Sequence, residues 1–267
     1  MTSANFPECL SITLASEGGL STDRNDPGNW TGGKIGKGIL KGTKYGISAA
    51  AFPALDIRNL TLDDAKPIYK ARYWDMIGGD ALPSGFDLAT FDYAVNSGPA
   101  RAQRDAQTVI GAAADGTFGP ITRLQAAGAG IGEIKALCAR RLSFMQSLAI
   151  WKSYRKGWSA RVAKIEAEAV AMFLRSQPGV DVKAALADEA NEAEKAAATL
   201  RKAGAAIAVS ASSGAGTGAA LPAEPNLVVL GGLMLVGLIV AGVLVVKAMR
   251  EKERADAYRA AETAIGR

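Results

Sequence analysis

Apolar residues recur at helical spacing along most of the chain, beginning close to the N-terminus. The segment 6–16 predicts a short helix, because Pro7 suits a first helical turn and Gly18 and Gly19 suit the end of a helix. One face of this helix would carry Phe6, Leu10, Thr13 and Leu14. Glu17 follows Leu14 by three residues, so it is expected to project from the same apolar face at the last turn.

The next segment changes character. Residues 21–43 are rich in Gly, Asn, Asp and Pro, which predicts a loop with turns or a short hairpin. Apolar residues at helical spacing predict further helices at 47–52 and 61–76. Thr61 with Asp64 three residues later is typical of a helix start, with Asp in place of the usual Glu or Gln.

Helical patterns dominate the rest of the chain. They are expected at 86–96, 101–110, 121–127, 133–151, 158–175 and 181–208. Strand patterning is expected only near 31–47, so the predicted fold class is mainly α with a small hairpin or loop region. Residues 209–225 are mostly small, which predicts a flexible linker.

An apolar stretch of twenty uncharged residues at 227–246 stands out near the C-terminus. At helical rise it would span ~30 Å, the thickness of a bilayer core. We therefore expect a C-terminal transmembrane helix at 226–248. Basic residues from Lys247 onward would place the C-terminus in the cytoplasm, and the preceding domains in the periplasm. The first residues lack the pattern of a cleavable signal peptide, which leaves the route across the inner membrane open.

The amino-acid composition excludes several classes of catalytic site. The chain has no histidine, which excludes the usual Ser-His-Asp and Cys-His machinery and removes the commonest zinc ligand. Cys9 and Cys138 are far apart in sequence and are expected to be buried small apolar residues. Residues 81–175 hold twelve basic and seven acidic residues, so this region either faces an anionic polymer or has an ordinary solvated surface.

Two carboxylates and a threonine are the candidate catalytic group. Glycoside hydrolysis needs one carboxylic acid that stays protonated and one carboxylate that stays ionised. Glu17, packed on an apolar face, would have a raised pKa and suits the acid, whereas Asp26 lies in a polar loop and suits the ionised partner. Taken alone, a Glu before two glycines is usually an ordinary surface residue, and an Asp-Pro-Gly is usually an ordinary turn.

These residues lie in motifs that resemble glycoside hydrolase family 108. The motifs are Glu17-Gly18-Gly19, Asp26-Pro27-Gly28 and Thr43-Lys44-Tyr45-Gly46-Ile47-Ser48. The family contains N-acetylmuramidases of phages and bacteria. The Glu-to-Asp spacing is also similar to that of phage-type lysozymes, where a threonine completes the group. The resemblance implies that Glu17, Asp26 and Thr43 are catalytic and that no metal or cofactor takes part.

One insertion departs from the compact family pattern. Residues 29–41 separate the Asp26 motif from Thr43, so either Thr31 or Thr43 could be the third residue, and the Tyr-Gly-Ile neighbours favour Thr43. The insertion could form a longer hairpin over the substrate groove. Trp30 would then stack on sugar or simply anchor the loop, and Tyr45 is a further candidate for substrate binding.

A second set of motifs resembles the predicted peptidoglycan-binding domain that follows this catalytic domain. It comprises residues 91–99, residues 115–122, and Gly157-Trp158 with Arg161. Within it, Asn96 and Ser97 could bind sugar or peptide, or could merely cap the end of a helix.

Together these observations predict a lysozyme-like muramidase domain at 1–82 and a helical peptidoglycan-binding module at 83–177. An Ala-rich helix and linker at 178–225, a membrane helix at 226–248 and a charged tail at 249–267 would follow. The expected partners are peptidoglycan strands, the membrane through 227–246 and a holin or other lysis protein, but not nucleic acid. The alternative is a non-catalytic, membrane-anchored peptidoglycan-binding protein of a virion or secretion system.

Overall fold

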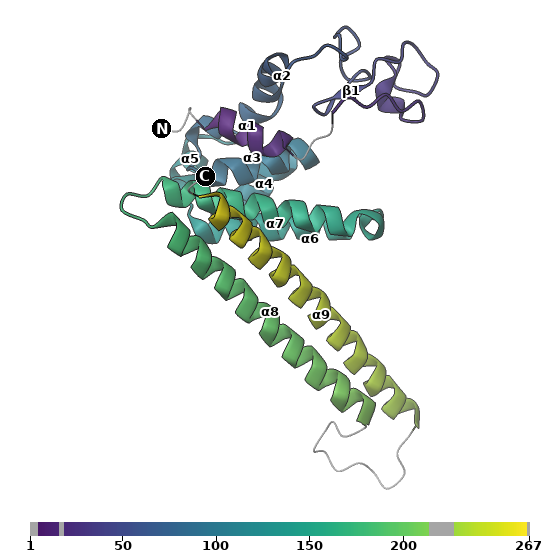
Figure 1. The fold of residues 1–267 in the computed structure, drawn as a ribbon, viewed down its shortest axis with the longest axis vertical. Helices are drawn as coiled ribbons and strands as arrows, with labels where there is room; N and C mark the ends of the chain where they lie inside the picture. The colour runs from purple at the N-terminus through teal and green to yellow at the C-terminus, as the bar shows by residue number, and fades with distance from the viewer. Residues whose placement is uncertain (1–4, 16–18, 214–226, 266–267) are drawn as a thin grey trace. The chain divides into compact units, whose positions relative to one another are not determined.

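The computed structural model describes residues 5–15, 19–213 and 227–265, and the chain divides into two compact units (Figure 1). The first unit comprises Met1–Tyr154 and Glu168–Pro178. The second comprises Arg155–Ala167 and Gly179–Arg267, so the long helix α7 (Trp151–Arg175) contributes to both. The described chain is mainly helical, as the sequence predicts.

Helices make up most of the first unit. Besides the first part of α7 and its last turns, they are α1 (Phe6–Leu14), α2 (Leu62–Tyr69), α3 (Phe86–Ser97), α4 (Pro99–Val109), α5 (Pro120–Ala126) and α6 (Ile131–Ser147). Short helical turns lie at Pro27–Asn29 (η1), Lys70–Trp74 (η2) and Gly79–Ala81 (η3). The predicted helix start at Thr61 is confirmed, because Thr61 and Asp64 form a reciprocal capping box.

Helix α3 runs through the core of this unit. All of its residues from Phe86 to Ala94 are buried, and α1 and η2 pack against it. Four aromatic rings fill the space between these elements, with ring centroids 5.4 to 6.5 Å apart: Phe6, Tyr69, Trp74 and Phe91. Cys9 and Cys138 are both buried thiols, which confirms their expected role as small apolar residues.

Two ion pairs lie in or beside this core. Arg141 and Asp92 form an ion pair of 2.6 Å between side chains that are almost completely buried. Tyr93 donates its hydroxyl to Asp105 at 2.6 Å, and Arg140 donates two hydrogen bonds to the same carboxylate. These pairs join α3, α4 and α6, since a charge buried without a partner would be strongly unfavourable.

A small antiparallel sheet lies between α1 and α2 in the sequence. Strand β1 (Thr43–Lys44) pairs with β2 (Ile47–Ser48). The connecting Tyr45 and Gly46 have φ angles of 51° and 71°, as a type I′ hairpin turn requires. The helix expected at 47–52 is therefore wrong: the tight turn directs Ile47 and Ser48 back along β1.

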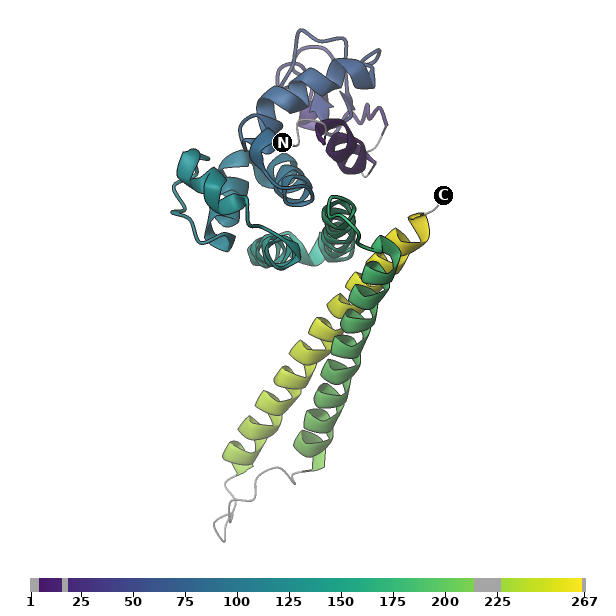
Figure 2. The same cartoon turned by 90° about the vertical axis from the view of Figure 1, so that its left-hand side faces the viewer.

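The second unit contains a helical hairpin formed by α8 (Val182–Ser213) and α9 (Leu227–Ala264), which lie side by side in both views (Figure 1 and Figure 2). The buried positions of α8 alternate in steps of four and three: Leu186, Ala190, Ala193 and Ala197. On α9 the buried Ala241, Ala248 and Ala255 are seven residues apart. This heptad spacing of mostly small residues explains the close antiparallel packing.

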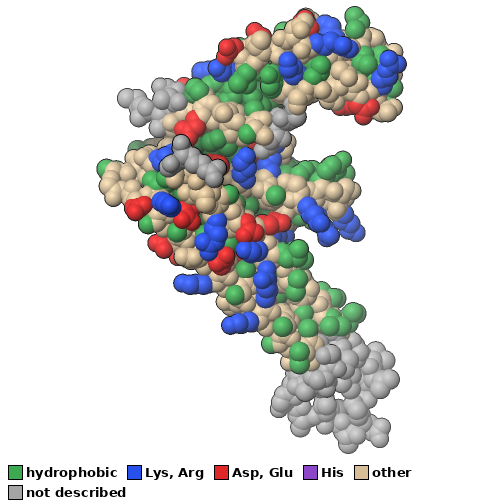
Figure 3. All heavy atoms as spheres, viewed as in Figure 1, with side chains coloured by type: hydrophobic (Ala, Val, Ile, Leu, Met, Phe, Trp, Pro, Cys, Tyr) green, Lys and Arg blue, Asp and Glu red, His purple; other side chains and the backbone are tan. Residues whose placement is uncertain are grey.

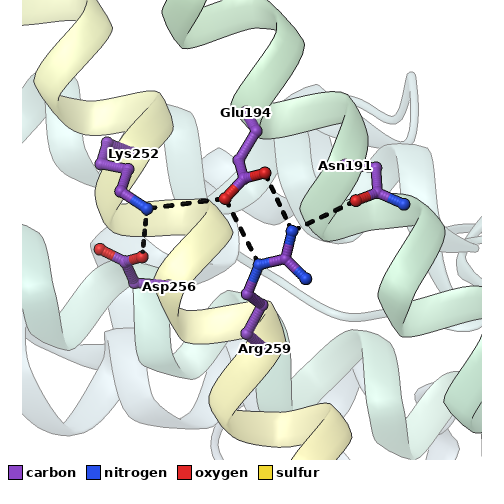
Figure 4. Close-up of polar contacts among 5 residues, drawn as sticks. All are labelled: Asn191, Glu194, Lys252, Asp256 and Arg259. Atoms are coloured by element: carbon purple, nitrogen blue, oxygen red, sulfur yellow. Dashed lines mark hydrogen bonds and ion pairs between the residues drawn. The ribbon is translucent and has the colours of Figure 1, made fainter.

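Polar contacts reinforce the hairpin along one side (Figure 4). Arg259 on α9 donates to Glu194 and Asn191 on α8, and Lys252 lies between Glu194 and Asp256. These groups are largely exposed to solvent, so each pair contributes little to the stability of the hairpin.

The predicted transmembrane helix at 226–248 is wrong. No helix in the described ranges combines the length and the apolar character that crossing a membrane requires. The stretch is part of the longer helix α9, which continues through Lys247 to Ala264 and packs one side against α8. The predicted anchoring in the inner membrane is therefore wrong as well. The predicted holin-type partner also loses its support. Apolar side chains are nevertheless exposed along α9 between Leu235 and Met249, as Figure 3 shows.

Candidate active site

A backbone pairing brings the two ends of the polar loop together. Ser21 and Thr43 exchange two hydrogen bonds, from Ser21 N to Thr43 O at 2.8 Å and from Thr43 N to Ser21 O at 2.9 Å. Ser21 thus adds a third short strand segment beside β1. Gly42 has a φ of 96° and lies so close to Ser21 that a Cβ atom would meet its carbonyl oxygen.

Asp26 lies in a tight turn within this loop. It is the N-cap residue of η1 (Pro27–Asn29), and its Oδ1 accepts a hydrogen bond from the N–H of Gly28 at 2.8 Å. Pro27 provides the fixed φ that a first helical position favours. The carboxylate is exposed, so its other oxygen can accept a hydrogen bond from water or substrate.

Asn29 joins this turn to Thr43. Its side chain is fully buried, with 0% of its surface exposed, and its Oδ1 accepts the hydroxyl of Thr43 at 2.7 Å. Its Nδ2 donates to the carbonyl oxygen of Asp23 at 2.9 Å, and its backbone N–H donates to Asp26 O at 3.1 Å. Its own carbonyl oxygen accepts from the N–H groups of Lys41 and Gly42. Asp26 and Thr43 are therefore connected through one residue.

Thr31 has a different environment. Residues 29–41 form a hairpin, as the sequence suggested, in which Trp30 pairs with Leu40 and Thr31 N donates to Ile39 O at 3.0 Å. The hydroxyl oxygen of Thr31 accepts the N–H of Ile39 at 2.9 Å. The side chain of Thr31 thus stabilises the hairpin rather than the Asp26 turn.

The two aromatic candidates are both held by hydrogen bonds. Trp30 donates its indole N–H to the carbonyl oxygen of Arg24 at 3.0 Å, which anchors the loop and leaves the ring half-buried. Tyr45 occupies the left-handed turn, where its carbonyl oxygen accepts the hydroxyl of Tyr69 at 2.6 Å. The Nζ of Lys44 lies 5.4 Å from the centre of the Tyr45 ring.

The remaining candidates lie elsewhere. Asn96 and Ser97 form the C-terminal end of α3, and Ser97 Oγ donates to Asn96 Oδ1 at 3.4 Å. Neither side chain has a hydrogen bond to the 21–48 loop among the residues that the structure describes. Glu17, the predicted acid, lies outside the described residues. It follows α1, whose buried face contains the predicted Phe6, Leu10, Thr13 and Leu14.

Asn29 was not among the residues predicted from the sequence. An asparagine in a polar loop is ordinarily exposed, and the neighbouring sequence gives no sign that this one is buried. It follows an Asp-Pro-Gly turn, precedes a tryptophan and opens an insertion. One sequence signal could have indicated it: Asn29 follows Asp26 by three residues, so a single helical turn brings the two residues close together.

Comparisons with known proteins agree on one family. A family model described as glycosyl hydrolase 108 matches residues 10–98, which include the second half of α1, the 21–48 loop and α3. The solved structure of SagA from Brucella abortus is 31% identical to this chain, with a TM-score of 0.55. That alignment covers 66% of this chain and 99% of the other. No curated protein matches the chain.

Proposed function

Since the chain belongs to glycosyl hydrolase family 108, and is a glycoside hydrolase of the peptidoglycan-cleaving type, we propose that it cuts one particular bond. This is the β-1,4 bond between N-acetylmuramic acid and N-acetylglucosamine. The observation that supports the proposal is the connection of Asp26 to Thr43 through Asn29, which binds the backbone of the one and the hydroxyl of the other. The proposal is that the exposed Asp26 carboxylate and the Thr43 hydroxyl together hold the attacking water.

Each residue has a distinct role in this proposal. Glu17 protonates the departing glycosidic oxygen, for which its pKa must lie near or above neutral pH. Asp26 accepts a hydrogen from the attacking water, and Thr43 holds that water in place. A carboxyl separation of ~6.5–9.5 Å would give inversion at the anomeric carbon, and a closer pair would make Asp26 a nucleophile with retention.

Thr43 is preferred to Thr31 as the third residue. The hydroxyl of Thr43 is linked to the Asp26 turn through Asn29, whereas that of Thr31 is engaged with the Ile39 N–H in the neighbouring hairpin. Family membership also favours a hydrolase over the alternative of a non-catalytic binding protein.

The helices from α3 onward, within residues 83–177, are proposed to bind the glycan or its peptide, as their motifs predict. In support, Gln107 organises the 115–118 loop: it accepts the N–H of Gly116 at 2.8 Å and donates to Asp115 at 2.7 Å. The neighbouring Ile121 and Leu124 on α5 are exposed, at 76% and 78%. Exposed apolar side chains next to a fixed polar loop suit a binding surface.

Analysis of the reaction products tests the proposed bond. Purified sacculi are digested with the protein, the products are reduced with borohydride and the new sugar alcohol is identified. We expect muramitol, from N-acetylmuramic acid at the new reducing end. Glucosaminitol instead would show cleavage of the other glycosidic bond. The anomer released first, read by NMR, distinguishes inversion from retention.

A further inference from the structure

The orientation of the Asn29 amide can be decided from its partners. The carbonyl oxygen of Asp23 only accepts hydrogen bonds, so the group 2.9 Å from it must be the NH₂ of Asn29. The opposite end facing Thr43 is then the carbonyl oxygen Oδ1, which also only accepts. Thr43 must therefore be the donor in the 2.7 Å hydrogen bond between them.

This fixes what the Thr43 hydroxyl can offer on its other side. A hydroxyl has one hydrogen and two lone pairs. Because the hydrogen of Thr43 points inward to the buried amide, only lone pairs remain for an outside group. A water molecule bound between the Thr43 hydroxyl and the Asp26 carboxylate must donate one hydrogen to each of them. Both of its hydrogens are then engaged, and its lone pairs are directed away from the two side chains.

We propose that Asn29 is a positioning residue that orients the attacking water through Thr43. The inference rests on the proposed function, and it assigns Asn29 no contact with the substrate. Asn29 is fully buried: its side-chain amide binds Asp23 and Thr43, and its backbone binds Asp26, Lys41 and Gly42. Because the backbone and both ends of the amide are held, the amide has little freedom to rotate, and the hydroxyl of Thr43 is held with it.

A double-mutant cycle on soluble glycan strands tests this role. Asn29→Ala and Thr43→Val should each lower kcat, by about tenfold or more if one oriented hydrogen bond is lost, with KM unchanged. The double variant should be no slower than the slower single variant, because Asn29 acts only through the hydroxyl of Thr43. Multiplication of the two losses would overturn the inference.

A matched control separates this effect from the loss of any amide hydrogen bond. Asn59 donates an Nδ2 hydrogen bond of 2.8 Å to Asp56 on the surface, so Asn59→Ala removes a bond of the same kind. We expect its kcat to equal that of the parent chain. A comparable loss of kcat in Asn59→Ala would show that the cycle reports loop stability rather than water orientation.

A second variant covers the case in which Asn29→Ala does not fold. In Asn29→Asp, the protonated acid can still donate to Asp23 O and accept from Thr43, whereas the carboxylate repels that carbonyl oxygen. The ratio of variant to parent kcat should therefore rise as the pH falls. A ratio that does not change with pH overturns the inference. A parent chain that releases no reducing sugar overturns the proposed function, and this inference with it.

Discussion

Ser21 and Thr43 are paired through two backbone hydrogen bonds, although 21 residues of polar loop separate them. The pairing holds Thr43 in the strand from which its hydroxyl donates to the Asn29 amide, and it depends on the absence of a side chain at Gly42. Catalysis is therefore expected to depend on Gly42, which takes no part in the reaction but allows Ser21 and Thr43 to pair.

Gly42→Ala should reduce both stability and activity. The φ of 96° is strained for any L-residue, and the new Cβ would also collide with Ser21 O and push the two strands apart. We expect a loss of about 1–3 kcal/mol in unfolding free energy and a fall in wall-clearing rate. Gly36→Ala is the control, because Gly36 has a φ of 76° but nothing within 4 Å of its Cβ position. Equal activity in both variants would show that the Ser21–Thr43 pairing is unimportant for catalysis.

The two threonine candidates predict different outcomes. Thr43→Val should lower kcat by about tenfold or more, since the hydroxyl that we propose holds the water is lost. Thr31→Val removes only the acceptor of the Ile39 N–H in a partly exposed hairpin, so kcat should stay within about twofold. Steady-state kinetics of both variants decide between them. The reverse pattern would make Thr31 the third residue.

Asp87 should make stability depend on pH between about 4 and 6. Burial raises the pKa of this carboxyl to about 6 from 3.8, although the Asn5 side chain and the N–H groups of Gly85 and Leu88 stabilise its charged form. The folded state then binds the proton more tightly than the unfolded state. Its stabilising contribution is full below pH 3.8 and is lost as the pH rises through 6, by about 3 kcal/mol in total.

Chemical denaturation of the parent and Asp87→Asn across this range checks the sign. The difference between their unfolding free energies should change in favour of Asp87→Asn as the pH rises, because the amide does not ionise. A difference that is constant with pH would show that Asp87 has an ordinary pKa in the folded state.

The hairpin of the second unit should tolerate large side chains on its outside only. Ala197 is buried between α8 and α9, whereas the neighbouring Ala198 is exposed. Ala197→Leu should destabilise the hairpin by about 1–3 kcal/mol through overpacking, and Ala198→Leu should be nearly neutral. Thermal unfolding followed by circular dichroism measures both. Equal effects would contradict the heptad packing of the two helices.

Local pattern predicted the helices well, because each buries an apolar face that repeats with helical spacing. The capping box at Thr61 and the apolar face of α1 follow from residues close together in sequence. At 47–52 the same pattern was misleading, since the Tyr45-Gly46 turn makes Ile47 the first residue of a strand instead. A turn with two positive φ angles outweighed the apolar spacing that followed it.

Non-local contacts were beyond such patterns. The apolar residues at 227–246 predict a helix that is apolar on most faces, but they do not say what covers it. Nothing in the local sequence indicates that α8 packs along α9. Asn29 was missed for a related reason. Its importance comes from Thr43, fourteen residues later, and from the burial of its own side chain between the two ends of the loop.

We propose above all that Glu17 is the acid of a muramidase that uses Asp26 to activate water. The most direct measurement is the release of reducing sugar from purified sacculi by the parent chain, Glu17→Gln and Asp26→Asn at equal folded concentration. We predict that the parent releases muramic acid reducing ends and that both variants lose about 100-fold or more of the rate. A Glu17→Gln variant that releases them as fast as the parent would contradict the claim.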